Sequence, residues 1–239
     1  MAGHSQFKNI MHRKGAQDEK RAKVFARLAR EISVAVKSGN DDPKQNPRLR
    51  NAIINARSEN MPNDKINNAI QKGSNCGNLN SLYEIRYECY GPNGIAIIVE
   101  TITDNKNRTA SEIRTILSKN NGRLAESGAV SFNFKKVGEL LFERNKVNAE
   151  KLIETAIEIG ATDFYENSSN IVIQCLVEDF SKIRDLLEKK FCEPKNLKLI
   201  WKVVNSIKVD DSIKTKILSL VDNLEQNDDV QAVYNNLEV

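Results

Sequence analysis

Apolar residues recur at helical spacing in the first third of the chain. Four of them, separated by three or four positions, share one face of a first predicted helix: Phe25, Leu28, Ile32 and Val36. Pro47 and Pro62 are placed to open two shorter helices, each of which has an apolar face of its own. We therefore expect residues 1–78 to be entirely helical.

From residue 83 the apolar period changes to that of strands. Residues 83–90 and 95–103 flank the turn sequence GPNG, which predicts a hairpin. A helix is predicted next, with Thr109 and Glu112 as its capping pair. A strand then places three apolar residues on one face: Val130, Phe132 and Phe134. We expect these phenylalanines to pack in a core rather than to stack on RNA bases, because the segment lacks the pattern of an RNA-stacking strand.

The stretch 138–204 repeats a known order of elements. It reads as strand, helix, strand, strand, helix, strand, which is the ferredoxin-like (βαββαβ) plan and is complete in itself. The pieces before and after it are expected to share one sheet, because a terminal strand needs a partner. The predicted fold class is α+β with three domains, an N-terminal three-helix domain followed by two α/β domains. The basic helical domain covers residues 1–78. A discontinuous α+β domain consists of residues 79–134 and 205–239, and the ferredoxin-like domain of residues 135–204 is inserted into it.

The charge of the chain is concentrated at its N-terminal end. The 239 residues contain 36 Lys and Arg and 32 Asp and Glu, a net charge of +4. Residues 1–78 hold 15 of the basic and 7 of the acidic residues, a net charge of +8, and the remainder carries −4. A cationic module on a mildly anionic body is typical of a protein that binds a polyanion through one end.

Basic residues occupy the face of the first helix opposite to its apolar face. They form a basic stripe: Lys20, Lys23, Arg27, Arg30 and Lys37. An arm without acidic residues precedes it, and its candidate contacts are His4, Lys8, His12, Arg13 and Lys14. The second helix adds Arg48 and Arg50. We predict that these side chains contact the phosphates of a nucleic acid, as positioning contacts with little base specificity. A solvated surface is the simpler alternative.

A second basic spot is predicted where Lys106 and Arg108 enter a helix. Backbone amides at such an entry favour an anion. A loop that caps its own helix is the default interpretation of this segment.

The sequence argues against catalysis. His4 and His12 are the only histidines, and neither has an acid or a cysteine at the spacing of a metal site. A serine or cysteine nucleophile would lack a histidine partner elsewhere, and no phosphate-binding glycine loop occurs. We expect no enzyme, no metal and no cofactor.

Cysteine spacing and hydropathy bear on the compartment. The four cysteines form no close pair, which indicates reduced thiols of a cytoplasmic protein, with Cys89 and Cys175 in the core. No run of about 18 apolar residues is present, so no membrane span is expected. A basic amphipathic start is also typical of a mitochondrial transit peptide, but acidic residues inside the first helix favour a part of the mature fold. The oligomeric state is left open, and a monomer is compatible with the sequence.

Several long motifs resemble the YebC family, in the correct order along the chain. They are AGHSQFKNIMHRK (2–14), NPRLRNAI (46–53), NMPNDKINNAIQKG (60–73), YGPNGIAIIVETITDNKNRT (90–109) and ESGAVSFNF (126–134). The resemblance implies a helical N-terminal domain followed by two α/β domains. Family members are described as cytoplasmic DNA-binding transcriptional regulators, and others, including mitochondrial translational activators, act on translation and are linked to ribosomes. Phe7 stands where the family usually has tryptophan.

The resulting hypothesis is a non-enzymatic, cytoplasmic, nucleic-acid-binding regulator of transcription with DNA as its target. The alternative is a translation factor that binds ribosomal RNA through the same basic surface. A weaker alternative is a small-molecule-sensing module built on the ferredoxin-like pair of domains. The sequence leaves open the choice between DNA and RNA, the regulated genes and the roles of the two α/β domains.

Overall fold

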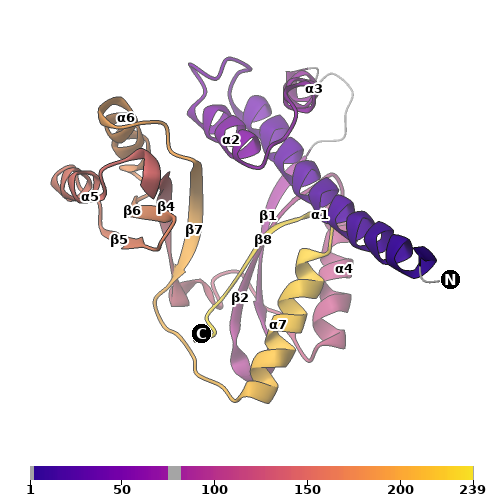
Figure 1. Cartoon of the computed structure of the whole chain (residues 1–239). Coiled ribbons are helices and arrows are strands. Elements are labelled where there is room, and N and C mark those ends of the chain that lie inside the picture. Colours follow the sequence, from indigo (N-terminus) through magenta and orange to yellow (C-terminus); the bar gives the residue numbers. More distant parts are fainter. Residues whose placement is uncertain (1–2, 75–81, 239) are drawn as a thin grey trace.

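The computed structural model of the chain describes residues 3–74 and 82–238, with side chains from residue 17 onward. A helical unit at the N-terminus is followed by two sheet units (Figure 1). The helices are α1 (Gly3–Ser38), α2 (Pro47–Ser58), α3 (Asn63–Ser74), α4 (Lys106–Lys119), α5 (Ala149–Glu158), α6 (Phe180–Lys190) and α7 (Asp211–Glu225). The strands are β1 (Tyr83–Tyr90), β2 (Ala96–Thr103), β3 (Arg123–Leu124), β4 (Phe134–Glu143), β5 (Asp163–Glu166), β6 (Asn170–Leu176), β7 (Asn196–Val203) and β8 (Val230–Asn235).

The helical unit is held together by the apolar faces that the sequence predicts. Phe25, Ile32 and Leu49 are among the side chains buried between α1, α2 and α3. Pro47 begins α2, and the Asn46 side chain caps this helix by accepting a hydrogen bond from the Leu49 amide at 3.0 Å. The predicted order of three helices is therefore correct.

Gly73 allows α3 to lie close against α1. A Cβ atom at this position would come within 2.7 Å of the Val36 Cβ and within 2.8 Å of the Ser33 carbonyl oxygen. The Ser33 hydroxyl also donates a hydrogen bond to the Ala69 carbonyl at 2.9 Å. These contacts fix which side of α3 faces α1 and which side faces solvent.

The first sheet is made from two distant parts of the chain. Its strand order is β3-β1-β2-β8, antiparallel throughout, so the last strand completes the sheet that the hairpin of β1 and β2 begins. Helices α4 and α7 cover one face through a core that includes Val99, Ile113 and Leu220. This topology brings the C-terminus of α7 and the start of β8 beneath α1 (Figure 1).

The second sheet has the ferredoxin-like plan that the sequence predicts. Its strand order is β5-β6-β4-β7, antiparallel throughout, and its two helices α5 and α6 pack on one face around Leu140, Phe142 and Ile173. The fold class is thus α+β, a helical region followed by two four-stranded antiparallel sheets. The boundaries of the three domains stay a prediction, which the connectivity of the two sheets supports.

The segment before β4 is not the strand that was expected. Residues 131–133 form a short 3-10 helix instead, because the carboxylate of Glu88 accepts hydrogen bonds from the amides of Gly128, Val130 and Ser131 at 2.8–3.0 Å. Glu88 is buried, and burial raises its pKa, but these hydrogen bonds outweigh burial and hold the pKa of Glu88 below its usual range. Phe134 is buried as expected, whereas Phe132 is 68% exposed, so the prediction that both pack in a core is wrong for Phe132.

The predicted capping pair of α4 is also wrong. The helix begins earlier, at Lys106, and the side chain of Asn105 caps it by accepting a hydrogen bond from the Arg108 amide. Thr109 lies inside the helix and its hydroxyl is bound to Asp229.

In the described part of the chain, none of the helices has the length and apolarity that a membrane crossing requires.

Candidate nucleic-acid interface

Part of the basic stripe on α1 faces the protein rather than solvent. The Arg27 guanidinium donates a hydrogen bond to the carbonyl oxygen of Glu225 at the C-terminus of α7, and the Arg30 guanidinium donates one to the carbonyl oxygen of Asp228. Arg30 also lies 3.7 Å from the carboxylate of Asp229. Cations at a helix C-terminus are stabilised by the partial negative charge of the last carbonyls. The expectation that the whole stripe points to solvent is therefore wrong for Arg27 and Arg30.

Two of the three arginines of α2, Arg48 and Arg50, are likewise bound to other parts of the protein. Arg48 forms paired hydrogen bonds to Glu31 on α1 and to Glu84 on β1, at 2.6–3.2 Å. The hydrogen bond to Glu84 raises the pKa of Arg48, and it lowers the pKa of Glu84. Arg50 reaches the Asp185 carboxylate on α6 at 2.7 Å.

The polar face of α2 docks on the ferredoxin-like unit. The Asn55 side chain donates a hydrogen bond to the Leu197 carbonyl at 2.6 Å and accepts one from the Leu197 amide at 2.8 Å, which pairs it with the exposed edge of β7. The Asn51 side chain accepts a hydrogen bond from the buried guanidinium of Arg184 at 2.7 Å. Helix α2 is therefore an element that holds two units together.

The second basic spot is also bound within the protein. Arg108 makes ion pairs of 2.8 Å to both Asp104 and Asp229. The hydrogen bond to Asp229 raises the pKa of Arg108. Lys106 lies over the ring of Tyr83, with its Nζ atom 4.1 Å from the ring centre. The loop before α4 caps its own helix, which is the simpler of the two interpretations given for this segment from the sequence.

Asp229 is the acceptor on which several of these groups converge. Its buried carboxylate also accepts hydrogen bonds from the hydroxyls of Thr109 at 2.7 Å and Thr103 at 3.0 Å. Burial opposes the charged form, but the hydrogen bonds from Arg108 and the two threonines outweigh burial and hold the pKa of Asp229 below its usual range. Asp229 thus joins β2, α4 and α1 at one point.

The remaining residues of the basic stripe are open to solvent. Lys20 and Lys37 are exposed, and among the described residues neither has a carboxylate partner. Lys23 pairs with Glu19 one turn away on α1, at 3.6 Å. The side chains of His4, Lys8, His12, Arg13 and Lys14 lie outside the described part of the structure, and their role stays a prediction.

The structure adds three exposed cations that the sequence reasoning did not select: Arg21, Lys65 and Lys72. Arg21 on α1 and Lys65 on α3 both lie over the ring of Phe25, with their charged groups 5.3 and 5.2 Å from the ring centre. Lys72 follows Lys65 two turns later on the same side of α3. We call Arg21, Lys65 and Lys72 the outer cations. The seven-residue spacing in α3 was a signal for this pair, but which helix lies beside Arg21 is decided by packing.

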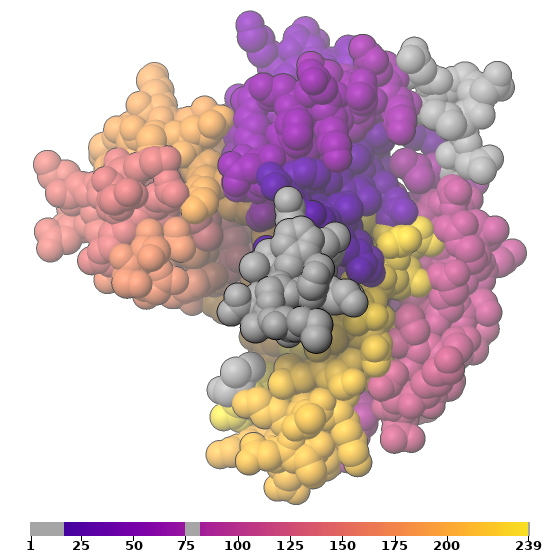
Figure 2. All heavy atoms as spheres, turned by 45° about the vertical axis from the view of Figure 1, so that its right-hand side comes forward, coloured from indigo at the N-terminus to yellow at the C-terminus, as the bar shows by residue number. Residues whose placement is uncertain are grey.

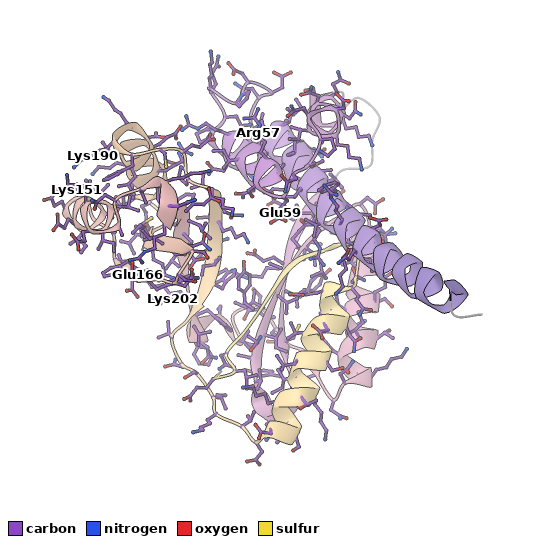
Figure 3. The ribbon with its side chains drawn as sticks, in the orientation of Figure 1. Arg57, Glu59, Lys151, Glu166, Lys190 and Lys202 are labelled. Atoms are coloured by element: carbon purple, nitrogen blue, oxygen red, sulfur yellow. The ribbon has the colours of Figure 1, made fainter. Side chains whose placement is uncertain are left out.

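A cleft of about 1480 Å³ lies where the helical unit meets both sheets. Figure 2 shows the helical unit above the C-terminal segment and beside the ferredoxin-like unit. Arg57 and Glu59, labelled in Figure 3, lie at the C-terminal end of α2, and each lines a smaller hollow together with residues of the ferredoxin-like unit. Acidic and basic side chains line the cleft in similar numbers: Arg27, Arg48, Arg86, Lys136 and Lys198, with Glu31, Glu59, Glu84, Glu100, Glu139 and Glu225. Such a mixed lining does not favour a polyphosphate chain.

Trp201 lies in this cleft and links the two sheets. Its indole nitrogen donates a hydrogen bond to Glu100 at 2.9 Å, and Arg86 and Lys136 lie over its ring at 5.0 and 5.3 Å.

Two of the cysteines, Cys89 and Cys175, are buried in the cores, as predicted, and burial raises the pKa of each thiol to about 12. Within the described residues, no group of three or more histidine, cysteine or acidic side chains gathers in the geometry of a metal site.

Fold and charge together define a modular protein in which a cationic helical unit is fastened to two antiparallel α/β sheets. The family model described as "TACO1/YebC protein N-terminal domain" matches residues 5–76, and the one described as "TACO1/YebC second and third domain" matches residues 82–237. The chain belongs to the TACO1/YebC family. This result confirms the predicted resemblance.

A solved structure agrees over nearly the whole chain. The crystal structure of the conserved hypothetical protein Aq1575 from Aquifex aeolicus is similar with a TM-score of 0.83 and 38% sequence identity, over 92% of this chain and 91% of that chain. At the level of the family, the comparisons support a regulatory, non-enzymatic role that involves nucleic acid.

Proposed function

We propose that this protein is a cytoplasmic regulator of transcription that binds DNA through the outer surface of its helical unit. The contacts that we assign are the outer cations Arg21, Lys65 and Lys72, together with the stripe residues Lys20, Lys23 and Lys37 and the arm residues His4, Lys8, His12, Arg13 and Lys14. Arg27, Arg30, Arg48 and Arg50 are assigned to the attachment of the helical unit instead, because protein oxygens already bind them.

One observation supports this proposal above the others. The outer cations are exposed and have no carboxylate partner among the described residues, and α3, which carries two of them, lies at the edge of the molecule away from both sheets (Figure 1), whereas the cleft between the units is lined by both signs of charge. A phosphate backbone attracts the first kind of surface and not the second.

The test is a charge reversal of the outer cations. In the variant Arg21→Glu, Lys65→Glu, Lys72→Glu, we expect the affinity for a B-form DNA fragment to fall by about 100-fold or more at moderate salt. The slope of log affinity against log salt should decrease by about one for each lost phosphate contact. Fluorescence anisotropy at several salt concentrations measures both quantities.

A matched control keeps the same change in net charge. The variant Lys151→Glu, Lys189→Glu, Lys216→Glu alters exposed lysines of α5, α6 and α7, and Figure 3 shows Lys151 on the side away from the helical unit. If both variants lose affinity equally, net charge rather than this surface binds DNA. If the wild type binds folded RNA or co-sediments with ribosomes but retains no DNA at physiological salt, the translation-factor alternative replaces the proposal.

A further inference from the structure

Helix α3 turns a continuous polar arc toward solvent. The exposed residues of this arc are Asp64, Lys65, Asn67, Asn68, Gln71 and Lys72. The opposite side is buried, since Ile66, Ala69 and Gly73 hold α3 against the rest of the helical unit. Helix α3 packs only on α1 and α2 among the described elements with extensive contacts, and Figure 1 shows it at the edge of the molecule, away from both sheets.

Three side-chain amides occupy the middle of this arc. Asn67, Asn68 and Gln71 are neighbours on the helix surface, because positions three and four apart lie side by side. None of the three has a hydrogen-bond partner among the described residues, so they do not cap a helix or bridge two elements. Within the described part of the chain, their donors and acceptors bind no other group.

Helix stability does not account for these residues. Asparagine is a weaker helix former than alanine, lysine or glutamate, since its side chain competes for backbone hydrogen bonds. Two adjacent asparagines in the interior of a short helix therefore weaken it. A merely solvated face is better served by the charged residues that favour helices, and this arc carries only one carboxylate, Asp64.

The amides of α2 show the contrast. Asn51 and Asn55 on that helix are bound to Arg184 and to the edge of β7, so the fold explains them. The amides of α3 are of the same chemical kind and lie in the same unit, but they have no such explanation. Because no described residue binds them, their position favours a partner outside the chain.

The chemistry of the arc fits the major groove of double-stranded DNA. A carboxamide offers one donor and one acceptor in the geometry that pairs with N6 and N7 of adenine, and the groove of about 12 Å admits one helix. Lys65 and Lys72 flank the amides, where they can contact phosphates on either side. No aromatic side chain is exposed on the described part of the helical unit, since Phe25 is buried beneath Arg21 and Lys65, so a platform for unpaired bases is absent there.

We propose that α3 is the helix that enters the major groove of duplex DNA, and that Asn67, Asn68 and Gln71 read base edges there, chiefly adenine. This inference rests on the proposed DNA-binding function and adds sequence discrimination to it. The outer cations supply affinity, and the amides supply preference among sequences.

Selection from a random duplex library, followed by measured affinities, tests the inference. The wild-type protein is expected to enrich adenine-containing sequences and to bind the enriched duplex at least tenfold more tightly than a scrambled one. In the variant Asn67→Ala, Asn68→Ala, Gln71→Ala this ratio should fall to near one, while the affinity for the scrambled duplex changes by less than threefold. Replacement of the enriched adenines by 7-deazaadenine should weaken binding of the wild type and leave the variant unaffected.

The control is Asn223→Ala, which removes a helical asparagine from α7, and it should keep the preference of the wild type. The inference is overturned if no sequence is enriched, if the triple alanine variant keeps its preference, or if 7-deazaadenine has no effect. In each of these cases the proposed function still stands if the wild type binds DNA in a salt-dependent way and the charge reversal of Arg21, Lys65 and Lys72 abolishes that binding. Absence of any duplex binding by the wild type overturns both.

Discussion

Two sets of cations in the helical unit share one sequence character but have opposite surroundings. The inner set binds oxygens of the protein itself and consists of Arg27, Arg30, Arg48 and Arg50. The outer cations Arg21, Lys65 and Lys72 have no carboxylate partner among the described residues. Each cation of either set adds one positive charge to the net charge of the unit. The difference shows that the number of basic residues overestimates the attraction for a polyanion. Only the cations that do not hold the fold together are available to bind one.

The two sets also differ in residue type, although the outer cations include one arginine, Arg21. Every member of the inner set is arginine, whose planar guanidinium has several donors in a fixed arrangement and so binds two acceptors at once. Arg48 does this with Glu31 and Glu84. Lysine, a compact and strongly hydrated charge, occurs only among the outer cations of the two sets, where a mobile contact with phosphate is sufficient.

The largest effect is expected from Asp229, the carboxylate that lies beside Arg30 just before β8. Replacing Asp229 by alanine leaves the hydroxyls of Thr103 and Thr109 and the Arg108 guanidinium without their acceptor. We expect the free energy of unfolding to fall by about 3 kcal/mol. Urea denaturation followed by the fluorescence of Trp201, the single tryptophan, measures this change. A loss below 1 kcal/mol would show that the attachment of α1 does not depend on this carboxylate.

Acidification provides the control for this prediction. Because the pKa of Asp229 is lowered in the folded state, its contribution to stability is complete above the unfolded pKa of about 3.9 and is lost as the pH falls through the folded value. The wild type should therefore lose more stability between pH 5 and pH 3 than Asp229→Asn, which has no carboxylate to protonate. Parallel pH profiles of the two proteins would contradict this assignment.

A smaller loss is expected at Arg48. The change Arg48→Met keeps an apolar stem but leaves Glu31 and Glu84 facing each other without a cation. We expect a loss of about 2 kcal/mol in the free energy of unfolding, reduced by partial exposure of the pair. Arg57→Met, at an exposed position of the same helix, should change stability by less than about 0.5 kcal/mol. Equal losses in the two variants would remove the distinction between bound and free arginines.

The double change Arg27→Ala, Arg30→Ala tests the comparison most directly. Loss of the hydrogen bonds to the end of α7 should lower the free energy of unfolding by about 1 kcal/mol. The affinity for DNA should change by less than threefold, because these guanidinium groups face the protein. Titration of the same DNA fragment with both proteins decides the point, and a tenfold loss of affinity would return these residues to the binding surface.

The smallest effect has the opposite sign. The change Asn68→Ala should raise the free energy of unfolding by about 0.5 kcal/mol, because alanine is the better helix former and Asn68 has no partner to lose. Thermal denaturation of the wild type and the variant measures the shift in Tm. A decrease in stability would mean that the amide makes a contact within the folded chain, and the argument from α3 would fail.

Much of the fold follows from local sequence. Pro47 after the capping Asn46 marks the start of α2, and the GPNG turn marks the hairpin of β1 and β2, because such signals act within a few residues. The order of elements from residue 138 to 204 was sufficient to predict the ferredoxin-like plan. The boundaries differ mainly at β4, which begins at Phe134, several residues before the predicted stretch 138–204.

The local sequence pattern gave a wrong prediction where a side chain distant in the sequence binds the backbone amides. The alternation of Val130, Phe132 and Phe134 is typical of a strand, but the carboxylate of Glu88 binds the amides of this segment and bends it into a loop. A buried carboxylate that must be satisfied outweighs a strand pattern of a few residues. Nothing in the segment itself reveals that acceptor.

The sequence by itself determined the order of most helices and strands, where the basic charge is concentrated and to which family the chain belongs. Only the tertiary structure decided that Arg27 and Arg30 face residues 225–229 and that the amides of α3 face solvent. The reason is physical: periodicity assigns a residue to one side of a helix, but the surroundings of that side depend on segments nearly two hundred positions away, which hydrophobic packing brings together.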